Sequence, residues 1–363
     1  MKILSIFKAF LLTSLLTFSS LKSLIPCIEI RKKGDQTLIL LHDCHLFHYS
    51  NLIKHSEKYL IHCLKTELNQ PIEILKAIKD SKIEKQNILV LNEIVEIESK
   101  DQILKDFLEK LYVREIYKNE KSLLGIILDI KKVEKESTIE ANKIRRGIAS
   151  LSFLNFLINK FEITCDNLEC RNDASNLITI SNEIDSYKNE SKNNIINKYY
   201  KNCANNFKKS KTCFILLLCM ILVQKRLIND IVLTFDFNNF NECNEEFLKW
   251  VDPLLEAKIL HEILNCKNKI MIAHFGAAHI KRLESLLDNV GFKKIDKIGL
   301  KYESIWHFIL LYCKFLTSFR LDLSDKHINN LDAELLLQQA QKLNIYNFLM
   351  KHLAPEKQIR SKL

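Results

Sequence analysis

Glycine and proline are unusually scarce in this sequence, and their scarcity limits the folds that the chain can adopt. The 363 residues include 6 glycines and 4 prolines, whereas average usage would give roughly 40 of the two together. A turn-dense all-β sandwich needs more of both, and Rossmann and P-loop nucleotide sites need clustered glycines. Hydrophobic residues at 47% and charged residues at 27% are typical of a globular protein. The sequence therefore predicts a helix-rich globular fold.

Apolar strand patterns alternate with helical patterns along the chain, which favours an α/β fold. Strands are expected at 28–31 and 37–41, around a turn at Lys33–Gln36, and then at 88–91, 123–128, 231–235, 270–273 and 294–298. Amphipathic spacing predicts helices at 51–68, 72–78, 102–111, 138–161, 245–264 and 277–289. We expect a mostly parallel central sheet with flanking helices, in a single domain over 28–363. A helical insertion is expected at about 166–228, and a helical C-terminal cap at about 303–363.

The N-terminus has the pattern of a secretory signal peptide. A positively charged start is followed by the apolar run Ala9–Leu21, which is shorter than a bilayer span. Small residues at Thr17 and Ser19 suit cleavage. We expect residues 1–23 to be removed on export to the periplasm or the exterior. Mass analysis of the native protein would then show a mature N-terminus between Ser20 and Cys27. The alternative is a buried or membrane-apposed N-terminal helix.

The cysteines do not favour an exported protein. There are 11, an odd number, and none shows the C-x-x-C spacing of zinc or redox motifs. Four cysteines in apolar helical patterns are expected to pack as small hydrophobic residues, namely Cys63, Cys213, Cys219 and Cys313. Only Cys165 and Cys170, in a polar stretch, suit a disulfide. The conflict between signal peptide and cysteine usage stays open at this point.

The net charge of +10 does not by itself indicate nucleic-acid binding. The lysines are dispersed among acidic residues, and the one dense basic stretch, 198–211, comes with no recognised binding motif. The apolar run 213–223 is shorter than a membrane span. We expect an unidentified substrate as partner, no nucleic acid, and no stable membrane span after signal cleavage. The oligomeric state is left open.

Polar side chains follow three of the apolar strands, where ligands bind in open α/β sheets. Asp43 and His45 follow 37–41, Glu93 follows 88–91, and His274 follows 270–273. Gly276, after the last of these strands, lets backbones approach closely, and Asp43 and Gly276 are candidates for binding the substrate. His279 falls in the first turn of the next helix, where the helix dipole favours a neutral imidazole that can act as ligand or base. These side chains can share one site if their strands are neighbours. We expect His279 to be partly exposed, and His274 to be packed in the core.

Several other polar residues are weaker candidates. Asp129 ends the expected strand 123–128, and Arg145 or the adjacent Arg146 has the position to face an acidic group or a substrate from its helix. The alternative for the arginines is a solvated helix face. Three further histidines are expected on a helix surface, namely His48, His55 and His62.

The segment Gly276-Ala277-Ala278-His279, followed by Leu283, Leu286-Leu287 and Val290-Gly291-Phe292-Lys293, resembles a family signature. It is similar to the C-terminal motif of TraB/PrgY and Tiki-type proteins, in the erythromycin esterase and ChaN-like superfamily. That family carries two G-x-x-H motifs. His45 matches the first histidine and Glu93 the strand-end glutamate, whereas His42 stands where the family has glycine. The resemblance implies an α/β core in which these residues converge on a hydrolytic site. Tiki-type members are metal-dependent peptidases, and erythromycin esterases use histidine.

Two classes of function follow from these patterns. The first is a hydrolase centred on His45, Glu93 and His279, which either hold a divalent metal ion or work without one, through a histidine base. The second is a catalytically inactive, exported binding or effector protein on the same fold. The departure at His42 from the family's tight turn favours the second class. The distances among the three side chains discriminate between the two.

Overall fold

The computed structural model describes residues 21–48, 57–93, 119–136, 160–168, 174–187, 193–209, 252–299 and 340–353, and single residues at 109, 112, 154, 157 and 158. Predictions for residues 1–20 and the stretches 213–223 and 231–235 lie outside this part of the chain. So do those for most of 102–111, of 138–161 and of the C-terminal cap. Within the described residues, no helix is long and apolar enough to cross a membrane.

A mixed sheet of six strands forms the centre of the fold. The strands are β1 (Leu21–Lys33), β2 (Gln36–His48), β3 (Ile88–Asn92), β4 (Thr164–Asn167), β5 (Ile270–Gly276) and β6 (Lys293–Gly299), in the order β4-β3-β5-β2-β1-β6. The four strands from β4 to β2 are parallel, and β1 is antiparallel to both β2 and β6. The expected α/β fold with a mostly parallel sheet is therefore confirmed.

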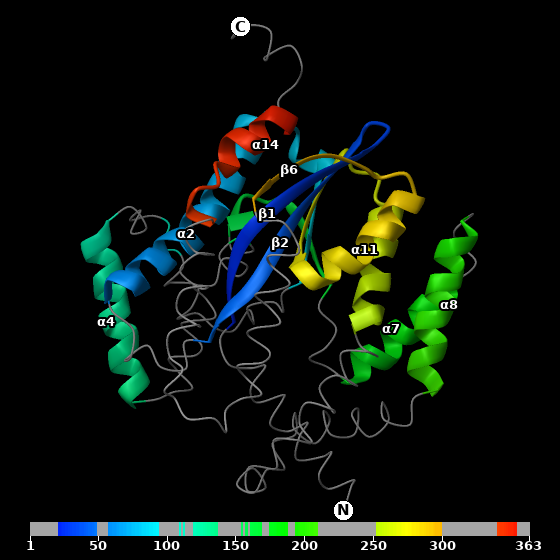
Figure 1. The fold of residues 1–363 in the computed structure, drawn as a ribbon, viewed down its shortest axis with the longest axis horizontal. Coiled ribbons are helices and arrows are strands. Elements are labelled where there is room, and N and C mark those ends of the chain that lie inside the picture. The colour runs from blue at the N-terminus through cyan, green and yellow to red at the C-terminus, as the bar shows by residue number, and fades with distance from the viewer. Residues whose placement is uncertain are drawn as a thin grey trace, which may run out of the picture.

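Helices cover both faces of the sheet (Figure 1). On one face lie α2 (Glu57–Asp80), α4 (Glu120–Glu136) and α14 (Ile345–Leu353). On the other lie α7 (Ala174–Tyr187), α8 (Asn194–Lys209), the helix 252–265 and α11 (Ala277–Asn289). A short 3-10 helix, η2 (Lys85–Asn87), precedes β3. Every residue of β3 and β5 is buried, because strands covered on both faces expose neither row of side chains.

The β1–β2 hairpin confirms the expected turn at Lys33–Gln36, where Gly34 takes the left-handed backbone φ of +56°. Both strands are longer than the sequence predicts. Their pairing extends to Leu21 opposite His48, so polar residues that look like a strand end still belong to the ladder. The predicted signal-peptide boundary at residue 23 consequently falls inside β1.

The structure differs from the predicted elements in two places. The expected strand 123–128 is part of helix α4, in which Leu123, Ile126 and Ile127 turn toward the core at helical spacing. A short apolar run does not distinguish the two periods. The helices expected at 51–68 and 72–78 are helical as predicted from Glu57 onward, but they form one helix, α2, which continues through Pro71. The strands at 88–91, 270–273 and 294–298 and the helix at 277–289 are confirmed, and the described part of the insertion is helical apart from its first residues, which lie in β4.

Candidate functional site

The carboxyl ends of β3 and β5 bring Glu93 to the start of α11. The two strands are neighbours, and the Glu93 N–H continues their ladder by donating to the carbonyl oxygen of His274, 3.2 Å away. The N–H of Gly276 donates to Oε2 of Glu93 at 2.5 Å. The carboxylate of Glu93 is therefore fixed by the end of the neighbouring strand.

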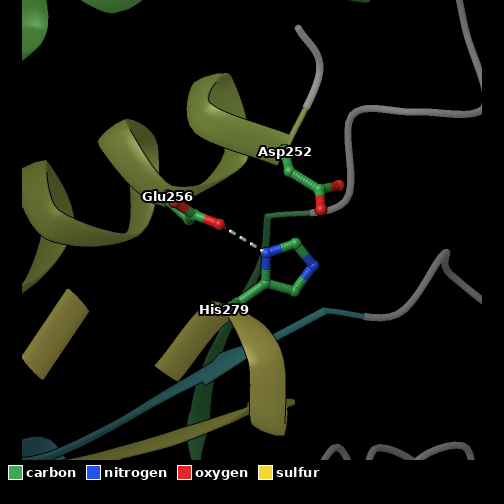
Figure 2. Close-up of side chains that lie close together, drawn as sticks. All are labelled: Asp252, Glu256 and His279. Carbon is green, nitrogen blue, oxygen red and sulfur yellow. Dashed lines mark hydrogen bonds and ion pairs between the residues drawn. The ribbon is translucent and has the colours of Figure 1, made fainter. Parts of the chain in front are cut away.

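His279 lies between two carboxylates. Helix α11 begins at Ala277, directly after β5, so His279 falls in its first turn as the sequence predicts. Nε2 of His279 is 3.7 Å from Oε1 of Glu93. On the other side of the ring, Nδ1 is 3.0 Å from Oε1 of Glu256 (Figure 2). An ionised carboxylate can only accept, and of the two only that of Glu256 lies within hydrogen-bond distance of the ring, so we assign the ring proton to Nδ1, which donates to Glu256. The lone pair of Nε2 then faces Glu93.

The helix 252–265 supplies two carboxylates that sequence reasoning missed. Asp252 and Glu256 are one helical turn apart and both buried. One donor atom each from Asp252, Glu256 and His279 lie within 4.8 Å of one another, so this group could hold a metal ion. The only signal in the sequence is the i, i+4 spacing of two acids on an apolar helix, which is equally typical of a solvated face.

Arg282 binds both of these carboxylates. Its Nε donates to Oε1 of Glu256 at 2.5 Å, and its Nη2 donates to Oδ2 of Asp252 at 2.8 Å. The same Nη2 is 3.1 Å from Nδ1 of His279. Both atoms carry hydrogens in this assignment, so they are in contact without a hydrogen bond, and Nη2 donates to Asp252. Burial lowers the pKa of Arg282, but the charges of Glu256 and Asp252 outweigh burial and raise it above its ordinary value. Arg282 is therefore a permanent cation beside the site.

Helix α8 of the insertion reaches the same group. The hydroxyl of Tyr199 donates to Oε2 of Glu256 at 3.4 Å. Burial, and then the neighbouring Cys203 and Glu256, raise the pKa of Tyr199 well above its ordinary value, so its hydroxyl stays protonated. Burial also raises the pKa of Cys203 to about 12, which keeps it a thiol. Neither residue has the ionised form that a nucleophile needs at neutral pH.

A second histidine–carboxylate pair lies at the same edge of the sheet. Nε2 of His274 is 3.7 Å from Oδ2 of Asp43, and both side chains are fully buried. Side chains alternate between the faces of a strand, so His274 continues the row of Ile272, which packs on the α2 side of the sheet. The expectation that His274 is packed in the core is confirmed.

Three histidines considered in the sequence lie in β2. His45 lies inside β2, two residues beyond Asp43, and its side chain is outside the described part of the structure. The tight turn considered before His45 is absent, because β2 continues through the fully buried His42, although its pairing with β1 is irregular between His42 and Cys44. His48 ends β2, so its assignment to a helix surface is wrong.

On the helices, His62 is exposed on α2, as expected. Asp129 lies on α4, not at a strand end. His55, Arg145 and Arg146 lie outside the described residues, as does Cys170, so the pairing proposed for Cys165 is not tested.

Comparisons with known proteins do not assign a family or a function to the chain. The resemblance to the TraB/PrgY and Tiki-type proteins rests on the quoted motifs alone, and the site rests on the residues of this chain. No family model, no curated protein and no solved structure matches the chain.

Proposed function

We propose that the chain carries a hydrolase-like site in which His279 and Glu93 act on a water molecule while Glu256 orients His279. The observation that supports this function is the imidazole between two carboxylates, 3.0 Å from Glu256 at Nδ1 and 3.7 Å from Glu93 at Nε2. When Nε2 takes a proton from water, Glu256 stabilises the imidazolium that forms. The resemblance of Gly276–His279 to a hydrolytic family supports the same proposal.

The donor atoms on the Nε2 side also suit a divalent metal ion. Two ligands about 2.1 Å from one ion can lie 3.7 Å apart, as Nε2 of His279 and Oε1 of Glu93 do. A divalent ion held there would lower the pKa of a bound water toward neutrality. Glu256 would then be the outer carboxylate that fixes the ligand ring through its other nitrogen. His45 remains the proposed third ligand. Without a metal, Nε2 of His279 serves as the base itself.

The second candidate is a non-catalytic, exported binding or effector protein. The side chains of His279 and Glu93 are 6% and 5% exposed, so the expectation of a partly exposed His279 is wrong. A histidine this deeply buried, with a hydrogen-bond partner, also suits a purely structural role. Export remains a proposal based on the N-terminal sequence.

Substitution of His279 by alanine tests the first candidate against the second. We expect His279→Ala to lower kcat/KM for a simple ester probe, p-nitrophenyl acetate, by at least about 100-fold, because a general base contributes that much. His62→Ala is the matched control, since it removes an exposed histidine from α2. Glu93→Gln should also lower the rate while far-UV circular dichroism stays unchanged.

Two results would contradict the proposal. One is a His279→Ala protein that is folded and as active as the control. The other is a protein that unfolds with either His279→Ala or His279→Gln, which would make His279 a structural histidine and favour the binding protein.

A further inference from the structure

The guanidinium cation of Arg282 already lies among the potential metal-ligand atoms of Asp252, Glu256 and His279. The guanidinium of Arg282 contacts Oδ2 of Asp252 at 2.8 Å, Oε1 of Glu256 at 2.5 Å and Nδ1 of His279 at 3.1 Å. These are the residues whose donor atoms lie within 4.8 Å of one another. The guanidinium therefore takes the place that an ion bound by all three would occupy.

Charge and exposure favour exchange of this cation. The carboxylates of Asp252 and Glu256 are 10% and 4% exposed, while the side chain of Arg282 is 41% exposed. Arg282 supplies one positive charge against two negative ones. It can rotate into solvent from the end of its long side chain, whereas the carboxylates are held inside. A divalent ion would neutralise both carboxylates, and oxygen and imidazole donors suit Zn²⁺ or Mn²⁺.

We propose that Arg282 is the resident cation of this group and that a divalent transition metal competes with it for Asp252, Glu256 and Nδ1 of His279. Coordination at Nδ1 would move the ring proton to Nε2, where the carboxylate of Glu93 accepts its hydrogen bond. Nε2 would then no longer present a lone pair to water. By occupying the place of the ion, Arg282 leaves the Nδ1–H of His279 paired with Glu256 and so holds the site in its active form, and this consequence rests on the proposed function.

Titration calorimetry with Zn²⁺ tests the competition without any assay of activity. We expect Arg282→Gln to bind Zn²⁺ about 10- to 100-fold more tightly than the wild type, since this is the size of effect that removing a unit positive charge about 4 Å from the ion has at a partly solvated site. Lys281→Gln is the matched control, because it removes a charge from the same helix that pairs with Glu284 instead. The control should leave the affinity unchanged. Arg282→Lys keeps the charge without the forked contacts and should give an intermediate affinity.

Double variants distinguish Zn²⁺ bound by Asp252, Glu256 and Nδ1 of His279 from Zn²⁺ bound between Nε2 and Glu93. Adding Asp252→Asn to Arg282→Gln should abolish the gain in affinity, and adding Glu93→Gln should preserve it. The proposal is overturned if folded Arg282→Gln binds Zn²⁺ no more tightly than the wild type. It is also overturned if the gain is lost with Glu93→Gln and kept with Asp252→Asn, which would place the ion at Nε2 and leave the proposed function standing. Should Arg282→Gln fail to fold, an Arg282→Lys protein with wild-type affinity overturns it.

Discussion

Replacing Arg31 by methionine is expected to cost about 3–5 kcal/mol of unfolding free energy, because it leaves a buried carboxylate without its main partner. Nε of Arg31 is 2.6 Å from Oε1 of Glu29, and the two side chains are 3% and 0% exposed. Burial raises the pKa of Glu29, but the charges of Arg31 and Lys294 outweigh it, so the net shift is downward and Glu29 stays ionised. Lys294, 3.0 Å away and 46% exposed, cannot replace the buried guanidinium. Urea unfolding at neutral pH measures the loss.

Two further variants show whether the buried charge is the cause. Lys351→Met breaks the exposed pair with Asp296 and should cost less than about 1 kcal/mol. Adding Glu29→Leu to Arg31→Met should restore much of the lost stability, because an apolar pair can replace a buried ion pair. Asp288, the other acidic partner of Arg31, is 52% exposed and can be hydrated. Equal losses for Arg31→Met and Lys351→Met would refute this account of the pair.

Acidification is expected to destabilise the protein through His42, and His42→Leu should remove that part of the pH dependence. Burial lowers the pKa of His42 to about 3, and its ring nitrogens have no hydrogen-bond partner among the described residues. In the unfolded chain its pKa is near 6.5. Between pH 6.5 and pH 3, His42 is therefore protonated in the unfolded state and neutral in the folded state. This contribution to stability is complete above pH 6.5 and is lost as the pH falls from 6.5 toward 3.

The expected size of the effect is about 2 kcal/mol between pH 8 and pH 5, since each pKa unit is worth about 1.4 kcal/mol. Urea midpoints at the two pH values give the loss for the wild type, for His42→Leu and for the exposed control His62→Leu. Carboxylates also contribute to acid unfolding, but they do so in all three proteins. Parallel losses in the wild type and His42→Leu would show that His42 is not the group responsible.

The parts of the fold that the sequence predicts are those whose signals are local. The continuous apolar runs 88–91 and 270–273 are strands covered on both faces, and α11 follows β5 at the residue expected. The run at 123–128 has the same apolar character, yet it belongs to α4. Local sequence does not separate these cases, because tertiary packing decides which period a short apolar run adopts.

The sequence predicts only some of the residues of the candidate site. Glu93 and His279 stand directly after buried strands, and the rule that parallel strands end at one edge brings them together. Asp252 and Glu256 come from a helix that approaches the start of α11 only in the folded chain. Arg282 is recognised as their partner only once those distances are known. His42 differs from these residues, because in the sequence it looks like a polar residue after a strand, whereas in the structure it is buried inside the long strand β2.

The protonation of the His279 ring tests the central claim most directly. Long-range ¹H–¹⁵N correlation NMR of the histidine side chains at pH 8 distinguishes a proton on Nδ1 from one on Nε2. We predict that His279 carries its proton on Nδ1, toward Glu256, and that Glu256→Ala shifts the ring toward the Nε2–H form. A ring that carries its proton on Nε2 in the wild type, or one that does not respond to Glu256→Ala, would contradict the proposed orientation of His279 as a base.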